Sequence, residues 1–68
     1  MVTYQYEVLF MREASGQPAL WFLSGKPGAP LGPNLLAVLN HLGQQGWRVV
    51  GMGDFGNSPR SEILLARP

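Results

Sequence analysis

Few side chains in this 68-residue chain are of the types that do chemistry. There is no cysteine, so disulfides, thiolate metal ligands and a cysteine nucleophile are excluded. The single histidine is His41, and the acids are Glu7, Glu13, Asp54 and Glu62. A metal site needs three or four ligands, and a catalytic base needs an orienting partner. His41 falls on the polar side of a predicted helix without such neighbours, so we expect no metal site and no enzyme.

Two further patterns resemble functional sites but have ordinary explanations. Glu7 and Glu62 would approach each other across a predicted sheet, yet two carboxylates on a solvated face are weak evidence for acid–base catalysis. Residues 25–28 have the composition of a phosphate-binding loop, but Pro27 replaces the hydroxyl residue that follows the lysine in such loops. We therefore expect a proline-rich linker there and no cofactor.

The charge pattern does not favour nucleic acid as a partner. The formal net charge is +1, and the basic residues are scattered singly rather than in a run that would follow a phosphate backbone. The aromatic residues Tyr4, Tyr6, Trp21 and Phe22 would need cationic neighbours to form a stacking platform for single strands. A binder of nucleic acid or of the transcription machinery is retained as a second hypothesis, using Arg12, Arg48 and Arg67.

Composition bears on size, compartment and assembly. Hydrophobic residues make up 46% of the chain and charged residues 13%, against about 25% charged in typical globular domains. One domain of this size, residues 1–68, buries only about 60% of its unfolded surface, so apolar surface is left for self-association. No apolar stretch is long enough to span a membrane, and no signal peptide is evident. We expect a soluble, cytoplasmic protein that does not contact a membrane.

The elements that position these side chains are arranged around residues 31–53. At about 100° per residue, Leu35, Leu39 and Leu42 fall on one face of an amphipathic helix, with Leu36 and Val38 beside them. The helix begins at Pro33, which suits a first helical position, or after Asn34, which suits a cap.

The end of this helix is predicted from a structural motif formed by Leu42, Gly46 and Trp47. If Gly46 is the left-handed residue after the helix, Trp47 contacts Leu42, as in a Schellman ending. Gly43 then lies in the last turn, and close packing on the sheet would explain the missing side chain. The alternative is that the helix ends at Gly43.

Four segments have the composition of β-strands: residues 2–12, 19–24, 47–54 and 61–67. In the first, the aromatic and β-branched residues share the face expected under the helix, namely Val2, Tyr4, Tyr6, Val8 and Phe10. The second shows no alternation, so that either Trp21 or Phe22 faces the core. In the third, Gly51 and Gly53 indicate a bulge or a close backbone approach.

The expected architecture is α+β, with element order ββαββ and one helix packed on one face of a four-stranded antiparallel sheet. A right-handed connection through the helix favours the strand order 2-1-3-4. Turns are predicted at residues 13–18, with Ser15 and Gly16 at the tip, and at residues 55–60. Residues 25–33 are predicted as a loop, too rich in proline and glycine for a ladder.

The opening YQYEVLF, the central LNHLGQQGWRVVGMG and the closing EILLARP together resemble a bacterial family catalogued as domain of unknown function 4177. Its pattern is Tyr-x-Tyr-x-Val, then Leu-Gly-x-x-Gly-Trp at the end of a helix, then an apolar strand ending in Arg-Pro. The resemblance implies the same fold and no particular activity, and residues 25–33 depart from it. The matching positions are Tyr4, Tyr6, Val8, Leu42, Gly43, Gly46, Trp47, Leu64, Leu65, Arg67 and Pro68.

The sheet face away from the helix is the candidate interface. Exposed apolar patches of several residues usually mark an interaction site. We expect a non-enzymatic module that forms a homodimer or larger assembly through this face or an edge strand. A third hypothesis is a small-molecule site at a subunit interface. The residues expected on this face are Leu9, Met11, Val50, Met52 and Leu64, with Trp21 or Phe22.

Overall fold

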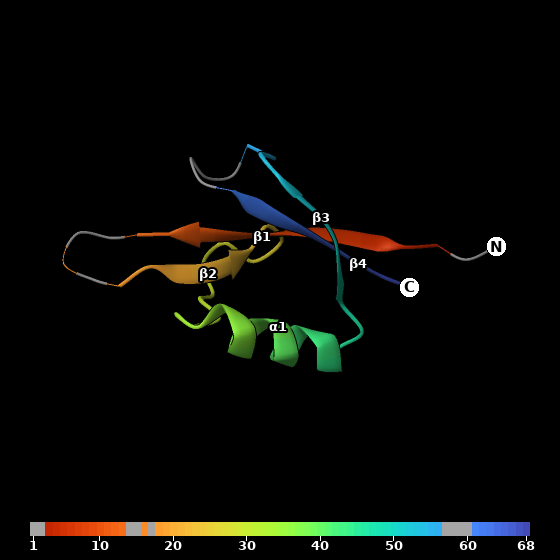
Figure 1. Ribbon diagram of the computed structural model, residues 1–68, viewed down its shortest axis with the longest axis horizontal. Coiled ribbons are helices and arrows are strands. Elements are labelled where there is room, and N and C mark those ends of the chain that lie inside the picture. Colours follow the sequence, from red (N-terminus) through yellow and green to blue (C-terminus); the bar gives the residue numbers. More distant parts are fainter. Residues whose placement is uncertain (1–2, 14–15, 17, 57–60) are drawn as a thin grey trace.

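The computed structural model describes residues 3–13, 16, 18–56 and 61–68 and confirms the predicted α+β fold with order ββαββ. Helix α1 lies along one side of a four-stranded antiparallel sheet (Figure 1). Parts of both predicted turns, Ser15 and residues 57–60, lie outside the described residues, as does Val2. The elements are β1 (Gln5–Arg12), β2 (Leu20–Leu23), α1 (Leu35–Gln44), β3 (Arg48–Gly53) and β4 (Glu62–Arg67).

The strand order is β2-β1-β4-β3, so the predicted order 2-1-3-4 is wrong. Strand β4 pairs antiparallel with both β1 and β3, and buried residues occur on both of its faces. A strand buried on both faces belongs in the middle of a sheet. Strand β3 carries two glycines and is mostly exposed, which is tolerated at an edge.

Both ends of α1 have local causes in the sequence. At the start, Asn34 is the N-cap, and its side-chain Oδ1 accepts a hydrogen bond from the Ala37 N–H at 3.0 Å. At the other end Gly46 has φ +90°. The Trp47 N–H donates to the Leu42 carbonyl at 3.1 Å, and the Gly46 N–H donates to that of Gly43 at 3.0 Å. These bonds confirm the predicted Schellman ending, and they exclude a helix end at Gly43.

Gly43 is not explained by close packing on the sheet. It is exposed, and a Cβ atom added there would meet no heavy atom within 4 Å. The predicted reason for this glycine is therefore wrong, because the last turn of α1 faces solvent at that position. The predicted orientation of His41 is confirmed: it is exposed, and its imidazole lies 3.3 Å from the amide nitrogen of Gln45.

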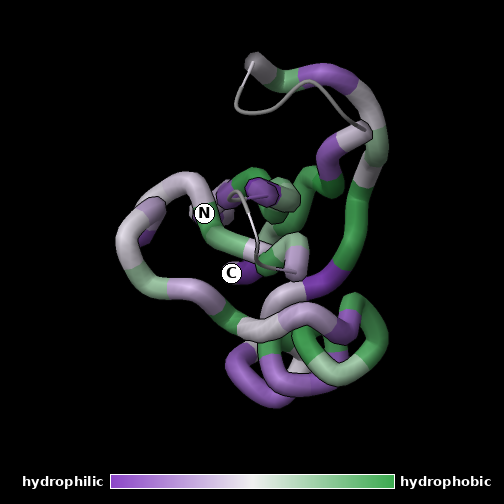
Figure 2. Tube along the Cα trace, turned by 90° about the vertical axis from the view of Figure 1, so that its left-hand side faces the viewer, coloured by the Kyte–Doolittle hydropathy of each residue, from purple (hydrophilic) through white to green (hydrophobic). Residues whose placement is uncertain are grey.

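The main core lies between α1 and the sheet. Figure 2, which looks roughly along α1, shows both hydrophobic and hydrophilic residues on the turns of the helix. Partly buried Leu35 and Leu39 add to the core from the helix, as does Trp21 from the sheet, whereas Leu36 is exposed. The buried members of the core are Leu9, Val38, Leu42, Trp47, Ile63 and Leu65.

The face of β1 that packs under α1 is opposite to the one predicted. Leu9 is fully buried in the core with the helix residues, whereas Tyr4 and Tyr6 are 45% and 62% exposed. The predicted position of the two tyrosines under the helix is therefore wrong. The cause is that β1 is buried on both faces near its middle, where Leu9 and Phe10 are adjacent, so alternation alone does not identify the inner face.

A smaller cluster occupies the other face of the sheet. The Phe10 and Phe22 rings stack with their centroids 5.8 Å apart, and the Arg12 guanidinium lies 5.4 Å from each centroid. Phe22 therefore belongs to this cluster, while Trp21 packs toward α1. The face away from the helix is thus partly filled by the chain itself.

Candidate interaction surface at the β3 edge

The edge of the sheet at β2 is covered by the chain. The Trp21 N–H donates to the Gly32 carbonyl at 3.0 Å, and the Leu31 N–H donates to the Trp21 carbonyl at 2.8 Å. A second bridge joins Leu23 to Lys26. The expectation that residues 25–33 make no ladder is therefore wrong in part. Two short bridges in this loop use the outward backbone groups of β2.

The edge at β3 is not covered by any residue that the structure describes. Strand β3 pairs with β4 on one side, and within the described part of the chain no backbone group bonds to its other side. Such an edge presents unpaired N–H and C=O groups that can pair with another strand. This is the first feature of a candidate site for interaction.

A β-bulge sets the direction of the side chains on β3. Val49 is opposite Leu65 of β4, and Gly51 is opposite Leu64, so Val50 is the additional residue. The predicted irregularity at Gly51 is confirmed. Because the bulge interrupts the alternation, Val49 and Met52 both share the face of the β4 residues that pack against α1, Leu65 and Ile63.

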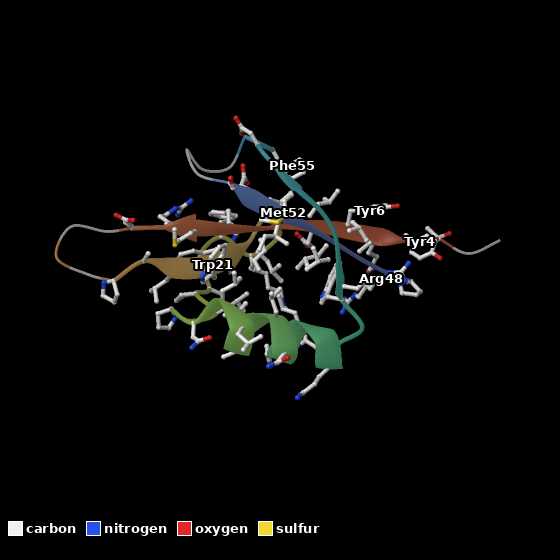
Figure 3. All side chains as sticks on the ribbon, in the orientation of Figure 1. Tyr4, Tyr6, Trp21, Arg48, Met52 and Phe55 are labelled. Carbon is white, nitrogen blue, oxygen red and sulfur yellow. The ribbon has the colours of Figure 1, made fainter. Side chains whose placement is uncertain are left out.

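The residues along this edge expose apolar side chains. Val49 is 48% exposed, Val50 is 46% exposed and Met52 is 70% exposed. Phe55, which follows the strand, is 42% exposed. Figure 3 shows Arg48 near the start of β3 and Met52 and Phe55 toward its other end. We define the β3 edge surface as these five residues, Arg48, Val49, Val50, Met52 and Phe55.

The predicted interface residues do not form one patch. Val50 and Met52 lie on the β3 edge surface, but Leu9 is fully buried in the core. Met11 and Leu64 are partly buried. They lie on opposite faces of the sheet, because Met11 shares the face of Leu9, two residues before it in β1, whereas Leu64 is paired with Val8 on the other face. The placement of all five on one open face is therefore wrong. Val49 and Phe55 are not among the predicted residues; two consecutive valines before a glycine are a signal for Val49, and the sequence carries no comparable signal for Phe55.

The three arginines assigned to nucleic-acid binding are not gathered on one surface. Arg12 lies over Phe10 and Phe22, and the Arg67 guanidinium lies 4.3 Å from the centroid of Trp47. Among the described residues, Arg48 has no side-chain hydrogen bond, ion pair or aromatic contact. Two of these cations are therefore held by the protein's own aromatic rings.

The acidic residues have structural partners. The Glu7 carboxylate accepts hydrogen bonds from the Ser24 hydroxyl at 2.7 Å and from the Gly25 N–H at 2.8 Å. Glu62 is buried and accepts from the Phe55 N–H at 2.9 Å. The register places Glu7 opposite Leu65, so Glu7 and Glu62 point to opposite faces of the sheet and do not form the predicted pair. In the described ranges no three histidine or acidic residues gather to hold a metal ion.

Residues from the start of β1, the end of α1 and the end of β4 meet at the start of β3. Arg67 stacks on Trp47, and its Nε–H donates to Gln5 Oε1 at 2.8 Å. One terminal nitrogen of the same guanidinium donates to the Gln45 carbonyl at 3.1 Å, at the C-cap of α1. Trp47 is buried in the core, and this arrangement fixes the end of β3 that follows the helix.

Comparison with models of protein families, with curated proteins and with solved structures found no match for this chain. Within the described residues, no helix is long and apolar enough to cross a membrane.

Proposed function

We propose that this chain is a non-enzymatic interaction module that assembles with a second copy of itself through the β3 edge. The observation that carries the proposal is the difference between the two sheet edges. One is bonded to residues 31–32, while at the other no described residue bonds to the outward backbone groups beside exposed Val49, Val50 and Met52. Strand addition at such an edge uses backbone hydrogen bonds for affinity and side chains for specificity.

The edge is a better candidate than the face away from the helix. On that face Phe10, Phe22 and Ala66 are already buried by the chain itself, and the exposed Tyr6 carries a polar hydroxyl group. The total accessible surface is 4613 Å², against about 4,200 Å² for a monomer of this mass. The radius of gyration is 12.0 Å, against about 11 Å for a compact chain of this length. The molecule is therefore extended and exposes more surface than a compact monomer.

The test is the mass in solution of wild type and of Met52→Asp, measured by light scattering over a concentration series. Edge-to-edge pairing buries a small area, and interfaces below about 1,200 Å² in total belong to weak complexes. We therefore expect the wild-type mass to rise toward that of a dimer at high concentration. An aspartate at position 52 of each copy should keep the protein monomeric, because it places two charges in an apolar contact.

Two matched controls locate the interface. Leu36 is 69% exposed on the outside of α1, close to the 70% of Met52, and Tyr6 is 62% exposed on the face away from the helix. Leu36→Asp and Tyr6→Asp should associate as wild type does. A wild-type chain that stays monomeric at high concentration would exclude the proposal. Loss of association in Tyr6→Asp alone would move the interface to the sheet face.

A further inference from the structure

The β3 edge surface also specifies how two copies would pair, an inference that rests on the proposed self-association. Two copies joined at the same edge are related by a twofold axis, and their β3 strands run antiparallel. Residues directly opposite each other in such a pair lie on the same face of the joined sheet. The faces of β3 therefore restrict which residues can be opposite one another.

The bulge makes this restriction specific. Arg48, Gly51 and Gly53 share the face of Ala66, Leu64 and Glu62, the residues opposite them in β4. Val49 and Met52 share the other face. The register that sets Val49 opposite Met52 of the second copy also sets Arg48 opposite Gly53 of that copy. In both pairs the two residues lie on the same face of the joined sheet. A shift by one residue in either direction places a residue of one face opposite a residue of the other.

In this register Arg48 would meet an aromatic ring of the second copy. A Cβ atom added at Gly53 would lie 3.7 Å from Phe55 Cζ, so the Phe55 ring lies over Gly53, where a side chain would otherwise be. The Phe55 N–H donates to Glu62 Oε1 at 2.9 Å, and this hydrogen bond positions the backbone of the residue that carries the ring. Phe55 is 42% exposed, so its ring is accessible to a cation from outside.

The other two described arginines show how Arg48 would bind. Arg67 and Arg12 each lie over an aromatic ring of their own chain, at 4.3 Å and 5.4 Å. Arg48 is exposed and lacks such a partner among the described residues. The second copy would supply that partner, twice by symmetry. Attraction between a guanidinium and an aromatic face is the expected interaction.

We propose that two copies pair antiparallel through β3, with Val49 of each opposite Met52 of the other and with Arg48 of each against the Phe55 ring of the other. Four aliphatic side chains then lie together on the helix side of the joined sheet. Two cation–π contacts lie on the other side. The helices of the two copies lie on the same face of one eight-stranded sheet.

Disulfide formation tests the register, because the chain has no cysteine of its own. In the proposed pair, Val49→Cys/Met52→Cys places each new thiol opposite a thiol of the second copy, within the Cα distance that a disulfide requires. We expect a covalent dimer under mild oxidation. The single variants Val49→Cys and Met52→Cys are the controls, since like positions would lie about 10 Å apart along the pair. They should remain uncrosslinked.

The outcomes separate this proposal from the one on which it rests. Crosslinking of Met52→Cys alone, or of Val49→Cys alone, would show a different register of the same edge and overturn the pairing. A dimer by light scattering that no cysteine variant crosslinks would also overturn it. A monomer at all concentrations would instead exclude self-association. The variants change exposed positions, so their folding is checked by the unchanged melting temperature of the reduced proteins.

The cation–π contact has a test of its own. Arg48→Gln removes the cation, and Phe55→Leu keeps an apolar side chain but removes the aromatic face. Each should raise the dissociation constant of the dimer by roughly five- to thirty-fold, since each removes two contacts. The double variant should lose no more than the worse single variant. Losses that multiply in the double variant would show that the two residues do not contact each other.

Discussion

At the β2 edge, Leu31 and Gly32 bond to Trp21 and occupy the backbone groups that face outward, whereas at the β3 edge the described residues leave those groups free. The cover at β2 is short and lies between Pro30 and Pro33. Proline has no N–H to donate, so a further strand cannot extend along this segment. A proline-rich loop therefore protects one edge from pairing.

The β3 edge has only weak forms of the same protection. Natural edges are shielded by charge, by proline or by a bulge that turns the strand away. Strand β3 has one charged residue, Arg48, no proline, and a bulge at Val50. The chain thus covers one edge with its own backbone, and its described residues leave the other edge open, which is the basis of the proposed pairing.

The largest expected effect is on the anchor of the β3 edge. Trp47 is 8% exposed and packs in the core directly before β3. Trp47→Ala should reduce the free energy of unfolding by roughly 3–5 kcal/mol, because a large buried side chain is removed. Urea denaturation measures this change. A melting temperature within a few degrees of wild type would show that β3 is held without Trp47.

The next effect concerns the turn that leads into β3. Gly46 has φ +90°, a conformation that residues with a Cβ atom rarely adopt. Gly46→Ala should destabilise the whole protein by about 1–2 kcal/mol, because the Schellman ending joins α1 to β3. Thermal unfolding followed by circular dichroism checks this. An unchanged transition would mean that the helix end relaxes without disturbing the strand.

A comparable change at the covered edge should act locally. Gly32 has φ +130° and its carbonyl accepts the bond from Trp21, while a Cβ atom added there would meet no heavy atom within 4 Å. Gly32→Ala should destabilise by about 1 kcal/mol and loosen the cover of β2. Hydrogen exchange at the Trp21 amide should become faster, whereas the amides between β1 and β4 should keep their protection. Equal acceleration throughout the sheet would contradict a local role for this loop.

The fold class and the helix end were predictable because their signals are local. The cap at Asn34 and the spacing of Leu42, Gly46 and Trp47 act within one or two turns of chain. The strand order was not predicted correctly, although SEILLAR has the continuous apolar composition of a central strand. The connection rule favours another order, because it concerns only the hand of the connection and does not include the burial that each strand requires.

The candidate site was predictable only in part. Val50 and Met52 were identified, but alternation placed Leu9 beside them, and it lies in the core. Two physical causes combine here. Strand β1 is apolar on both faces, so its inner face is decided by packing against α1 and not by its pattern. The bulge shifts the alternation of β3 by one residue, and a sequence pattern of period two does not include that shift.

The smallest expected effect has the opposite sign and touches neither edge. Gly43 lies in the last turn of α1 with helical backbone and is exposed, and there is open space for a Cβ atom at that position. Alanine is a better helix former than glycine, so Gly43→Ala should stabilise the protein by up to about 1 kcal/mol. Urea denaturation should show a higher midpoint with an unchanged slope, and the association of wild type should be retained. A lower midpoint would mean that this turn needs the flexibility of glycine, for instance to let Gln45 and Gly46 form the cap that directs the chain into β3.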